Sequence, residues 1–382
     1  MLNYQQELNK IKSKYLLRER MLVSQKENNM VLCNDKKVIS FCSSDYLNLS
    51  QHPDVINAFK SAADQYGVGS TASQLICGYN SLQHKLEQGI ASFFNRPKAL
   101  VFSTGYMTNL GLLTTLVSKN DIILADKLCH ASLIDGMRYS GARFIRYRHN
   151  DTKHLEILLK KYKSKRIWIV TEGVFSMNGD IAPLNEIVKL KQNYHAKLIL
   201  DDAHGIGVLG AQGLGTLELT EVDANEVDLL VGTFGKAFGG FGAFVVGNDE
   251  LIEYLIQKCR TLIYTTALPP AIIQAMQMSL TIIQQETWRR EKSQSLINHF
   301  RDKAKQLNLP LLDSKTPIQP IMIGDNKKLQ QINRHLLDNG FWVGAIRPPT
   351  VPPNTARLRI GLNVAHTIEQ INSLLEKINE FS

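Results

Sequence analysis

The sequence lacks several features that mark secreted, zinc-binding and membrane proteins. Its 382 residues contain only five cysteines, which occur singly, so there is no CxxC pair and no even-numbered set for a disulfide framework. The cysteine pattern favours a reducing compartment, and the polar residues 1–14 offer no apolar secretory signal, so we expect a cytoplasmic protein. The most apolar long stretch, 229–247, contains Lys236 and six glycines. A central lysine would be costly inside a bilayer, so we expect no membrane span.

Two kinds of nucleotide-related motif are also missing. The phosphate-binding pattern GxxxxGK[ST] fails around Lys236, because Leu230 replaces its first glycine and Ala237 replaces its final hydroxyl residue. The net charge is +9, but the basic residues are scattered and cluster only at 10–20 and 160–166. No nucleic-acid-binding motif accompanies them. We therefore expect no nucleic-acid partner, and an anionic substrate fits the positive charge equally well.

Short apolar runs alternate with helical patterns through most of the chain. The predicted strands are 99–103, 122–125, 144–147, 166–171, 197–201, 228–231 and 242–247, and the predicted helices are 81–94, 106–116, 152–163 and 184–194. Strand–helix alternation favours an α/β fold with a mostly parallel sheet covered on both faces. Ligands bind such sheets beyond the carboxyl ends of the strands.

The run Leu268-Pro-Pro270 interrupts this alternation. After it, residues 271–303 have the pattern of one long helix, followed by a smaller α/β segment. We expect three parts: an N-terminal helix and hairpin in residues 1–45, a large domain in 46–285 and a small C-terminal domain in 286–382.

The segment Thr233-Phe-Gly-Lys-Ala-Phe-Gly-Gly-Phe-Gly242 surrounds a lysine with glycine and phenylalanine. Desolvation lowers the pKa of a lysine, which makes it a usable nucleophile or Schiff-base partner. Upstream, Leu200-Asp-Asp-Ala-His204 ends an apolar strand. A carboxylate at that place can keep a heterocyclic nitrogen protonated and so make the ring an electron sink, with the histidine near a ring oxygen. Capping carboxylates and a solvent-facing histidine are the alternative interpretation.

Other strand ends carry further polar residues. Ser103-Thr-Gly-Tyr-Met-Thr-Asn109 suits a phosphate seat at a helix N-terminus or a plain helix cap. His130, after Asp126, is either structural or stacked on a ring, and Glu172 and Ser176 could face one cleft. In Arg357-Leu-Arg359 the arginines alternate on a predicted strand, so we expect one to face inward, where it could grip a substrate carboxylate. An edge-strand charge is the alternative.

Three segments together resemble a known family: Asp201-Asp-Ala-His-Gly205, Thr233-Phe-Gly-Lys236 and Thr171-Glu-Gly-Val-Phe-Ser-Met177. They are similar to the α-oxoamine synthases, pyridoxal-phosphate (PLP) enzymes of the aspartate-aminotransferase fold, also called fold type I. The resemblance runs from about Arg18 to the C-terminus. It implies PLP as cofactor, a large domain with a mostly parallel sheet plus a smaller C-terminal α/β domain, and a homodimer with shared active sites.

The resemblance also implies a role for each site residue. The catalytic residues are Lys236, which holds PLP as a Schiff base, Asp201, which pairs with the pyridine nitrogen, His204, which contacts the ring oxygen, and His130, which stacks on the ring and meets the substrate. Gly105, Tyr106, Ser176 and Thr233 complete the cofactor-binding set, and Arg18, Thr350 and Arg359 bind substrate, with Arg359 on the amino-acid carboxylate. No metal is implied. Thr265 and Thr266 are candidates for reaching the neighbouring subunit's phosphate.

Within the family, the segments 345–350, 355–359 and 149–154 match members that condense L-alanine with a pimeloyl thioester in biotin synthesis. The acyl group would arrive on CoA or on an acyl carrier protein, and Lys236 would remove the Cα proton. Condensation of glycine with acetyl-CoA is the alternative inside the family. The chain departs from the usual family residues at Ser44, Asn48, Leu75 and Asn354, a difference that concerns acyl-chain specificity.

Two alternatives from other classes stay open at this point. One is a metal-dependent hydrolase built on Asp201, Asp202, His204 and His130, although their spacing matches no metal signature. The other is a basic nucleic-acid-binding module, whose binding would weaken with salt.

Overall fold

The computed structural model describes residues 3–381, which form two compact units. Unit 1 comprises Met1–Asn48, Ser176–Asp180 and Glu291–Ser382, and unit 2 comprises Leu49–Phe175 and Ile181–Arg290. No helix among residues 3–381 is both long enough and apolar enough to cross a bilayer.

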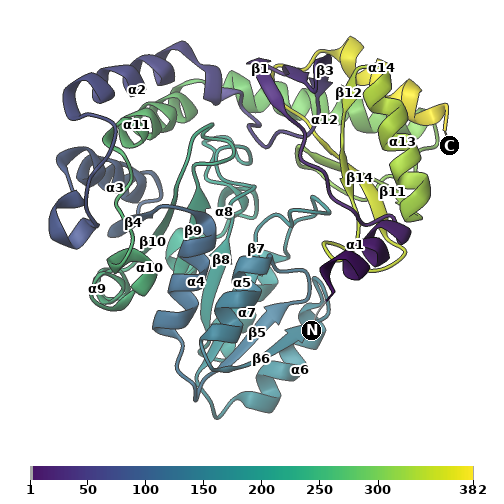
Figure 1. The fold of residues 1–382 in the computed structure, drawn as a ribbon. Coiled ribbons are helices and arrows are strands. Elements are labelled where there is room, and N and C mark those ends of the chain that lie inside the picture. The colour runs from purple at the N-terminus through teal and green to yellow at the C-terminus, as the bar shows by residue number, and fades with distance from the viewer. Residues whose placement is uncertain (1–2, 382) are drawn as a thin grey trace. The chain divides into compact units, whose positions relative to one another are not determined.

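Unit 2 is built on a seven-stranded sheet in the order β4-β10-β9-β8-β7-β5-β6 (Figure 1). Its strands are β4 (Lys98–Phe102), β5 (Ile122–Asp126), β6 (Arg143–Tyr147), β7 (Ile167–Glu172), β8 (Lys197–Asp201), β9 (Leu229–Thr233) and β10 (Ala243–Gly247). Strands β6, β5, β7, β8 and β9 pair in parallel, and β10 pairs antiparallel with both β9 and β4. The expectation of a mostly parallel sheet is confirmed, and each predicted strand lies within two residues of an observed one.

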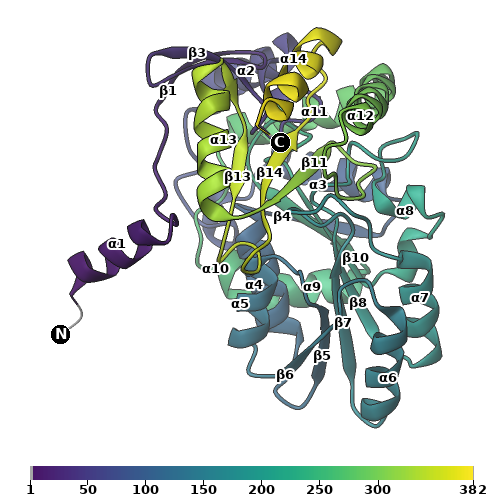
Figure 2. The same ribbon diagram turned by 90° about the vertical axis from the view of Figure 1, so that its right-hand side faces the viewer.

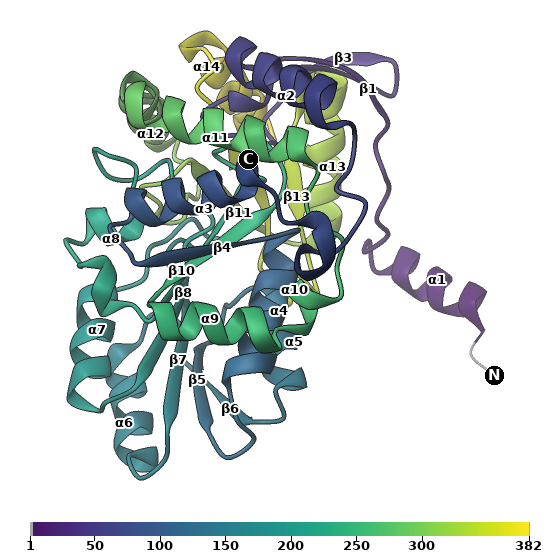
Figure 3. The same ribbon diagram turned by 90° about the vertical axis from the view of Figure 1, so that its left-hand side faces the viewer.

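Helices surround this sheet, and several begin at a side-chain cap. They are α2 (Pro53–Tyr66), α3 (Ser81–Phe93), α4 (Gly105–Leu116), α5 (Ala131–Tyr139), α6 (Thr152–Tyr162), α7 (Leu184–Asn193), α8 (Thr216–Leu219), α9 (Asp249–Lys258), α10 (Arg260–Ile263) and α11 (Pro270–Gln285), with shorter turns η1 (Leu49–Gln51), η2 (Gln74–Gly78) and η3 (Ala224–Glu226). Thr104 caps α4, His130 caps α5 and Asp151 caps α6. Figure 3 shows α11 against α2 and α3, which it contacts. Strands β5, β7 and β10 are buried along their whole length, as a sheet covered on both faces requires.

The prediction of one long helix over 271–303 is wrong. Helix α11 ends at Gln285, and α12 (Trp288–Gln306) starts after a break at Glu286 and Thr287. The Glu286 carboxylate accepts a hydrogen bond from Nε of Arg289 at 2.7 Å and lies 3.6 Å from Nε2 of His52. Local side-chain contacts therefore stabilise the break, and neither glycine nor proline marks it in the sequence.

Unit 1 contains two smaller sheets. The first has the order β1-β2-β3-β12, with β1 (Val23–Glu27), β2 (Met30–Cys33), β3 (Lys36–Ser40) and β12 (Phe341–Trp342); the second has the order β11-β14-β13, with β11 (Ile318–Gly324), β13 (Gly344–Ile346) and β14 (Ala356–Gly361). The helices are α1 (Tyr4–Ser13), α12, α13 (Asn326–Asp338) and α14 (Ile368–Asn379). Figure 2 shows α13 beside β13 and β14, which it contacts. The expected N-terminal helix and hairpin are present, and β3 joins the C-terminal strand β12 in parallel.

Each unit has its own apolar core. In unit 2 the core residues Ile123, Val170 and Ile199 come from neighbouring parallel strands and are inaccessible to solvent. In unit 1, Phe41 and Phe300 pack with side chains of β14, α13 and α14. Burial of these apolar surfaces is the main stabilising contribution in both units.

Candidate active site

Polar residues of unit 2 collect where its strands end. Asp126, Glu172, Asp201 and Thr233 are the last residues of β5, β7, β8 and β9, which run parallel to one another. Their carboxyl ends therefore lie at one edge of the sheet, where ligands of such folds bind. Strand β4 runs in the same direction as β9, because both pair antiparallel with β10, so it ends at this edge too. The predicted cofactor residues of unit 2 lie at the ends of β4, β5, β8 and β9 or shortly after them: Gly105, Tyr106, His130, Asp201, His204, Thr233 and Lys236.

Asp201 is held by two hydrogen bonds from N–H donors. Nδ2 of Asn109 donates to its Oδ2 at 2.6 Å, and the backbone N–H of Ala203 donates to its Oδ1 at 3.1 Å. The Asn109 amide also lies 3.0 Å from Oγ of Ser132. These contacts fix the carboxylate at the end of β8. Asn109 was not among the predicted site residues, although a buried asparagine on the mostly apolar helix α4 is a usable signal.

His130 is within electrostatic reach of both Asp201 and Lys236. Its Nδ1 is 2.8 Å from Oγ of Ser132, and its backbone N–H donates to Oε1 of Glu172 at 2.5 Å. Desolvation lowers the pKa of the ring, the Asp201 carboxylate opposes that change and the Lys236 ammonium adds to it. The residue still keeps solvent contact. His130 thus shares its surroundings with both Asp201 and Lys236, and the lowered pKa favours a neutral ring suited to stacking.

Lys236 lies in the turn between β9 and β10, which is fixed on both sides. Thr233 donates through Oγ1 to the carbonyl of Gly242 at 3.0 Å, and the backbone N–H of Phe234 donates to the same carbonyl at 2.9 Å. The rings of Phe234 and Phe238 meet edge to face at 5.3 Å between centroids, and both are buried. Lys236 is itself half-buried. Its amine is therefore carried by a turn whose aromatic side chains, Phe234 and Phe238, are buried.

The start of α4 has the properties of an anion seat. Thr104 caps the helix by accepting from the N–H of Met107 at 3.1 Å, and no atom lies within 4 Å of the place where a Cβ on Gly105 would stand. A helix N-terminus that opens onto free space presents its N–H groups and positive dipole end to an anion such as phosphate. Tyr106 is exposed, and its hydroxyl donates to Asp135.

Asp202 has a structural role. It is inaccessible to solvent, and its Oδ2 accepts from the N–H of Thr216 at 2.6 Å, the first residue of α8. A Cβ on Gly173, Gly205 or Gly215 would collide with its carboxylate. Burial raises the pKa of Asp202 to about 7. The carboxylate therefore packs between backbone segments, as part of the turn that carries the buried His204.

The metal-dependent alternative loses its basis in this geometry. Within residues 3–381, no group of three or more histidine, cysteine, aspartate or glutamate side chains is arranged to hold a metal ion. Asp202, one of its four proposed ligands, is engaged with the N-terminus of α8.

Arg18, Ser176, Thr350 and Arg359 belong to unit 1, and Arg359 on β14 is the most constrained of them. Its Nε donates to the carbonyl of Ser176 at 2.7 Å, and its Nη2 lies 3.4 Å from the hydroxyl of Tyr46. The expectation that Arg357 and Arg359 face opposite ways is wrong. Both are buried, and Arg357 donates to Asn178 in the same short segment that contains Ser176. Residues two apart on a strand share a face, so both arginines reach that segment.

Arg18 and Thr350, the other two predicted substrate residues, lie together in unit 1. Nη2 of Arg18 is 3.3 Å from Oγ1 of Thr350, although 332 positions separate the two in the chain. Both line a groove of unit 1 between residues 12–21, α13 and residues 342–350. In unit 2, Thr266 forms an isolated bridge with Ser73.

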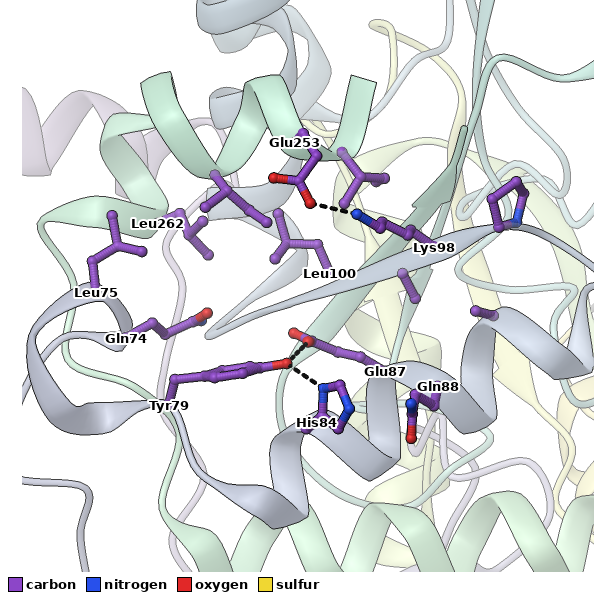
Figure 4. A pocket seen from close by; sticks show the side chains of 15 residues that line it. Gln74, Leu75, Tyr79, His84, Glu87, Gln88, Lys98, Leu100, Glu253 and Leu262 are labelled. Carbon is purple, nitrogen blue, oxygen red and sulfur yellow. Dashed lines mark hydrogen bonds and ion pairs between the residues drawn. The ribbon is translucent and has the colours of Figure 1, made fainter. Parts of the chain in front are cut away.

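A separate cavity of about 670 Å³ lies in unit 2 between η2, α3, β4 and α9 (Figure 4). The hydroxyl of Tyr79 donates to Oε2 of Glu87 at 2.9 Å and lies 3.0 Å from Nδ1 of His84. Oε1 of Glu87 accepts from the N–H of Val101 at 3.0 Å, and burial raises the pKa of Glu87. None of the predicted site residues lines this cavity. Glu87 connects the segment after η2 to strand β4.

The donor set at the sheet edge fits a flat, phosphorylated nitrogen heterocycle. It contains an amine for covalent attachment, a carboxylate held by N–H donors, an imidazole whose neutral form is favoured, and an open helix N-terminus. These are the groups that PLP requires, so the residues of unit 2 fit the cofactor that the resemblance implies.

The chain is similar to known enzymes along most of its length. Residues 36–378 match the family "aminotransferase class I and II". The chain is 48% identical over 371 residues to 8-amino-7-oxononanoate synthase of Methylococcus capsulatus, covering 97% of this chain and 96% of that protein. It is 47% identical over 365 residues to the synthase of the same name from Pseudomonas putida, covering 96% and 93%.

Two solved structures are similar over nearly the whole chain. A serine palmitoyltransferase from S. paucimobilis, with a bound adduct of PLP and myriocin, has a TM-score of 0.94 at 30% identity and covers 99% of this chain and 96% of its own. The 8-amino-7-oxononanoate synthase from Francisella tularensis has a TM-score of 0.79 at 36% identity and covers 90% and 97%. The fold is therefore that of PLP enzymes of fold type I.

Proposed function

We infer that this chain, which belongs to the class I and II aminotransferase family and within it to the α-oxoamine synthases, condenses L-alanine with a pimeloyl thioester. The reaction is a PLP-dependent acyl transfer that yields 8-amino-7-oxononanoate, carbon dioxide and free thiol in biotin biosynthesis. One observation carries this conclusion: the chain is 44–49% identical, over nearly its full length, to a series of 8-amino-7-oxononanoate synthases. The lysine, aspartate and histidine set in unit 2 supports it.

PLP, when bound, supplies an electron-withdrawing ring that stabilises negative charge on the substrate Cα. We propose that Lys236 holds the cofactor covalently and that Asp201 keeps its ring nitrogen protonated. His130 would stack on the ring, His204 would contact its oxygen, and the start of α4 would seat its phosphate, while Thr233 and Ser176 stay candidates for the rest of the cofactor-binding set. Asn109 positions Asp201 for this work through the 2.6 Å hydrogen bond.

The proton and the carboxylate of the amino acid are handled by two different side chains. The ε-amine of Lys236, once neutral, takes the Cα proton, because a neutral amine is the base form. Arg359 holds the substrate carboxylate. Its contacts with Ser176 and Tyr46 use only part of the guanidinium, which has five N–H donors, and so leave donors for a carboxylate.

We also propose that two copies of the chain associate. Large apolar side chains are exposed on two segments that pair through the Ser73–Thr266 bridge. Val68 is 90% exposed, Ile76 80% and Tyr264 72%. Exposed apolar side chains grouped in this way mark an interaction surface. A homodimer would cover them, and Ile76→Asp should shift sedimentation velocity from dimer to monomer.

The proposed place of action is the cytoplasm. All five cysteines are free, and Cys77 is exposed. Free thiols persist in a reducing compartment such as the cytoplasm.

A panel of substrates tests the proposed reaction. Steady-state turnover would be measured with L-alanine, glycine and L-serine, each against pimeloyl, acetyl and palmitoyl thioesters. We expect kcat/KM for L-alanine with pimeloyl thioester to exceed every other pair by about a hundredfold, because discrimination rests on pocket contacts. Preference for glycine with acetyl-CoA would show instead that the chain belongs with the sister enzymes.

A further inference from the structure

Residues 138–166 carry most of the excess positive charge of the chain. The whole sequence has a net charge of +9, and this segment alone contains ten lysines and arginines but only two acidic residues. All ten cations are exposed. They are spread along the sequence, but the fold gathers them on strand β6, on helix α6 and on the turns beside these two elements.

Six of these cations have no carboxylate partner. The other four pair with nearby acids at 2.6–3.4 Å. The six form no ion pair within 4 Å anywhere in residues 3–381, and we refer to them together as the basic face: Arg143, Arg146, Lys153, Lys161, Lys163 and Lys165. Their charges are therefore not neutralised within the chain.

Ordered elements hold the basic face. Strand β6 pairs with β5 as the last strand of the sheet, and α6 begins at the Asp151 cap and buries its leucine side chains in unit 2. Figure 1 shows β6 and α6 next to each other, and the two are in contact. The ring of Tyr162 lies 5.6 Å from the guanidinium of Arg143 and 5.6 Å from the amine of Lys161, so it joins the start of β6 to the end of α6.

Stability alone does not explain where these cations lie. Cations on an edge strand oppose pairing with other chains, and cations in the last turn of a helix interact favourably with its dipole. These effects account for Arg143, Arg146 and Lys161. Lys153, however, lies in the first turn of α6, where positive charge is unfavourable, and Lys165 lies in the turn before β7. A surplus of cations remains, which indicates an anionic binding partner.

The basic face reaches the sheet edge that carries the candidate active site. After the end of β6, Nδ1 of His149 lies 2.9 Å from Oδ1 of Asp126, and the backbone N–H of Asn150 donates to Oδ2 of the same carboxylate at 2.8 Å. Asp126 is the last residue of β5, so the end of β6 and the start of α6 with Lys153 lie at this edge. The rest of the basic face extends away from it.

The size of the basic face distinguishes between the two donors considered for the proposed reaction. Strand β6 and helix α6 are each about 16 Å long, and unpaired cations lie near both ends of each. The phosphates of CoA lie together in one part of the molecule and cannot contact all of these positions. An acyl carrier protein is a small acidic protein that presents its thioester on a flexible phosphopantetheine arm. It can dock beside a site while the thioester enters it, and opposite charges steer such an encounter.

Two other polyanions fit the basic face less well. Binding of a helix to a membrane surface requires an exposed apolar face, whereas α6 buries its leucines in unit 2. A nucleic acid would meet the same cations through its phosphates, but the sequence contains no nucleic-acid-binding motif. The position beside the site of acyl transfer favours a partner that delivers the acyl group.

We propose that the basic face docks an acidic acyl carrier protein that delivers the pimeloyl group. This proposal rests on the proposed function, because the carrier supplies a substrate of that reaction. It assigns to the carrier protein a contact surface that CoA does not use. The basic face would speed association and lower the KM of the carrier-bound donor, while the chemistry depends on the residues at the sheet edge.

A charge reversal at the end of the basic face nearest the site tests this proposal. The variant is Arg146→Glu/Lys153→Glu, which changes two exposed residues, and glutamate is compatible with the first turn of α6. The control is Lys292→Glu/Lys315→Glu, which changes the net charge equally at two exposed lysines of unit 1. One donor is a bacterial acyl carrier protein loaded with pimeloyl-phosphopantetheine. The other is pimeloyl-pantetheine, which has no protein part.

In the wild type, kcat/KM with the carrier-bound donor should fall as the salt concentration rises, because exposed charges are screened. At low salt the variant should lose about tenfold in kcat/KM with this donor, mainly through KM. Its kinetics with pimeloyl-pantetheine should stay as in the wild type, and the control should behave as the wild type with both donors. An unchanged KM for the carrier-bound donor in the variant, or an equal loss with both donors, overturns the proposal.

A binding measurement makes the test independent of turnover. Surface plasmon resonance with the unacylated carrier protein should give a Kd about tenfold weaker for the variant than for the wild type and the control. If this difference is present but no pimeloyl thioester is turned over, the proposed reaction fails and the docking surface stands. If pimeloyl-pantetheine is turned over but the carrier binds all three proteins equally, the docking surface fails and the reaction stands. A short DNA duplex that binds the wild type more tightly than the carrier does, and loses affinity for the variant, overturns the proposal in favour of a nucleic-acid partner.

Discussion

The side-chain amide of Asn109 donates a hydrogen bond of 2.6 Å to Oδ2 of Asp201, across 92 positions of sequence. One residue lies in the first turns of α4 and the other at the end of β8. The contact joins the expected phosphate seat to the carboxylate that is expected to meet the ring nitrogen. It makes Asn109 a positioning residue for the proposed reaction.

Replacing Asn109 by leucine should lower kcat about tenfold to a hundredfold, since a buried hydrogen bond to a charged group is lost. The protein should still take up PLP, but the absorbance of the bound cofactor should shift, because Asp201 is no longer held in place. Asn193→Leu, on the exposed side of α7, is the matched control. An unchanged kcat and spectrum in Asn109→Leu would show that Asp201 needs no such support.

Arg359→Lys should raise the KM for L-alanine at least about tenfold and change the KM for the thioester little. A lysine cannot replace a planar guanidinium that already contacts Ser176 and Tyr46 and must also grip a carboxylate. Arg357→Lys is a close control, because Arg357 is buried on the same strand and contacts Asn178. Steady-state kinetics with L-alanine and with the thioester varied in turn distinguish the effects of Arg359→Lys and Arg357→Lys. An equal rise in both KM values for Arg359→Lys contradicts the assigned role.

Asp202 should make unfolding depend on pH. The pKa of Asp202 is about 7 in the folded protein, whereas the ordinary value for an aspartate, expected in the unfolded chain, is 3.8. The folded state therefore binds the proton more tightly. The free energy of unfolding is then highest below pH 4 and falls as the pH rises toward 7, by about 4 kcal/mol at most. Asp202→Asn should remove this slope in chemical denaturation followed between pH 4 and 8. A variant with the wild-type slope would mean that the carboxylate is not desolvated.

His366 in unit 1 should give the free energy of unfolding the opposite pH dependence, because its pKa is lowered in the folded protein. Burial lowers its pKa to about 4, while its ring accepts from the N–H of Asn363 at 2.9 Å, lies 3.1 Å from the carbonyl of Ser40 and stacks on Phe41. The contribution of the neutral ring is present above pH 6.5 and is lost as the pH falls toward 4, by about 3 kcal/mol.

The variant His366→Phe keeps the stacking partner but cannot titrate. It should be less stable than the wild type at pH 7, because two hydrogen bonds are lost, yet its unfolding should depend less on pH between 6.5 and 4. Denaturation curves at a series of pH values give both quantities. Parallel pH profiles for wild type and variant would exclude His366 as the titrating group.

The strands and the polar residues at their ends could be predicted because their signals are local. Runs such as Ile167–Glu172 are apolar on both faces, and Lys236 lies in a glycine-rich segment directly after a strand. The family resemblance then supplied roles that no spacing could provide. The roles of the individual residues stay proposals that mutation must test.

Other features depend on contacts that the sequence does not display. The break between α11 and α12 is stabilised by Glu286 with Arg289 and His52, which no local breaker announces. The contact of Asn109 with Asp201 joins distant segments. The prediction that Arg357 and Arg359 face opposite ways was wrong for a different reason. Residues two apart on a strand lie on the same face, so strand geometry alone already placed both arginines together.

The most direct test of the account asks where the cofactor is attached. The purified protein would be incubated with PLP, reduced with borohydride, digested and analysed by mass spectrometry, with Lys236→Ala treated in the same way. The cofactor mass should be found on the peptide that contains Lys236 in the wild type, and the variant should have neither this label nor turnover. Attachment at another lysine in the wild type, or turnover that persists in Lys236→Ala, would contradict this role of Lys236.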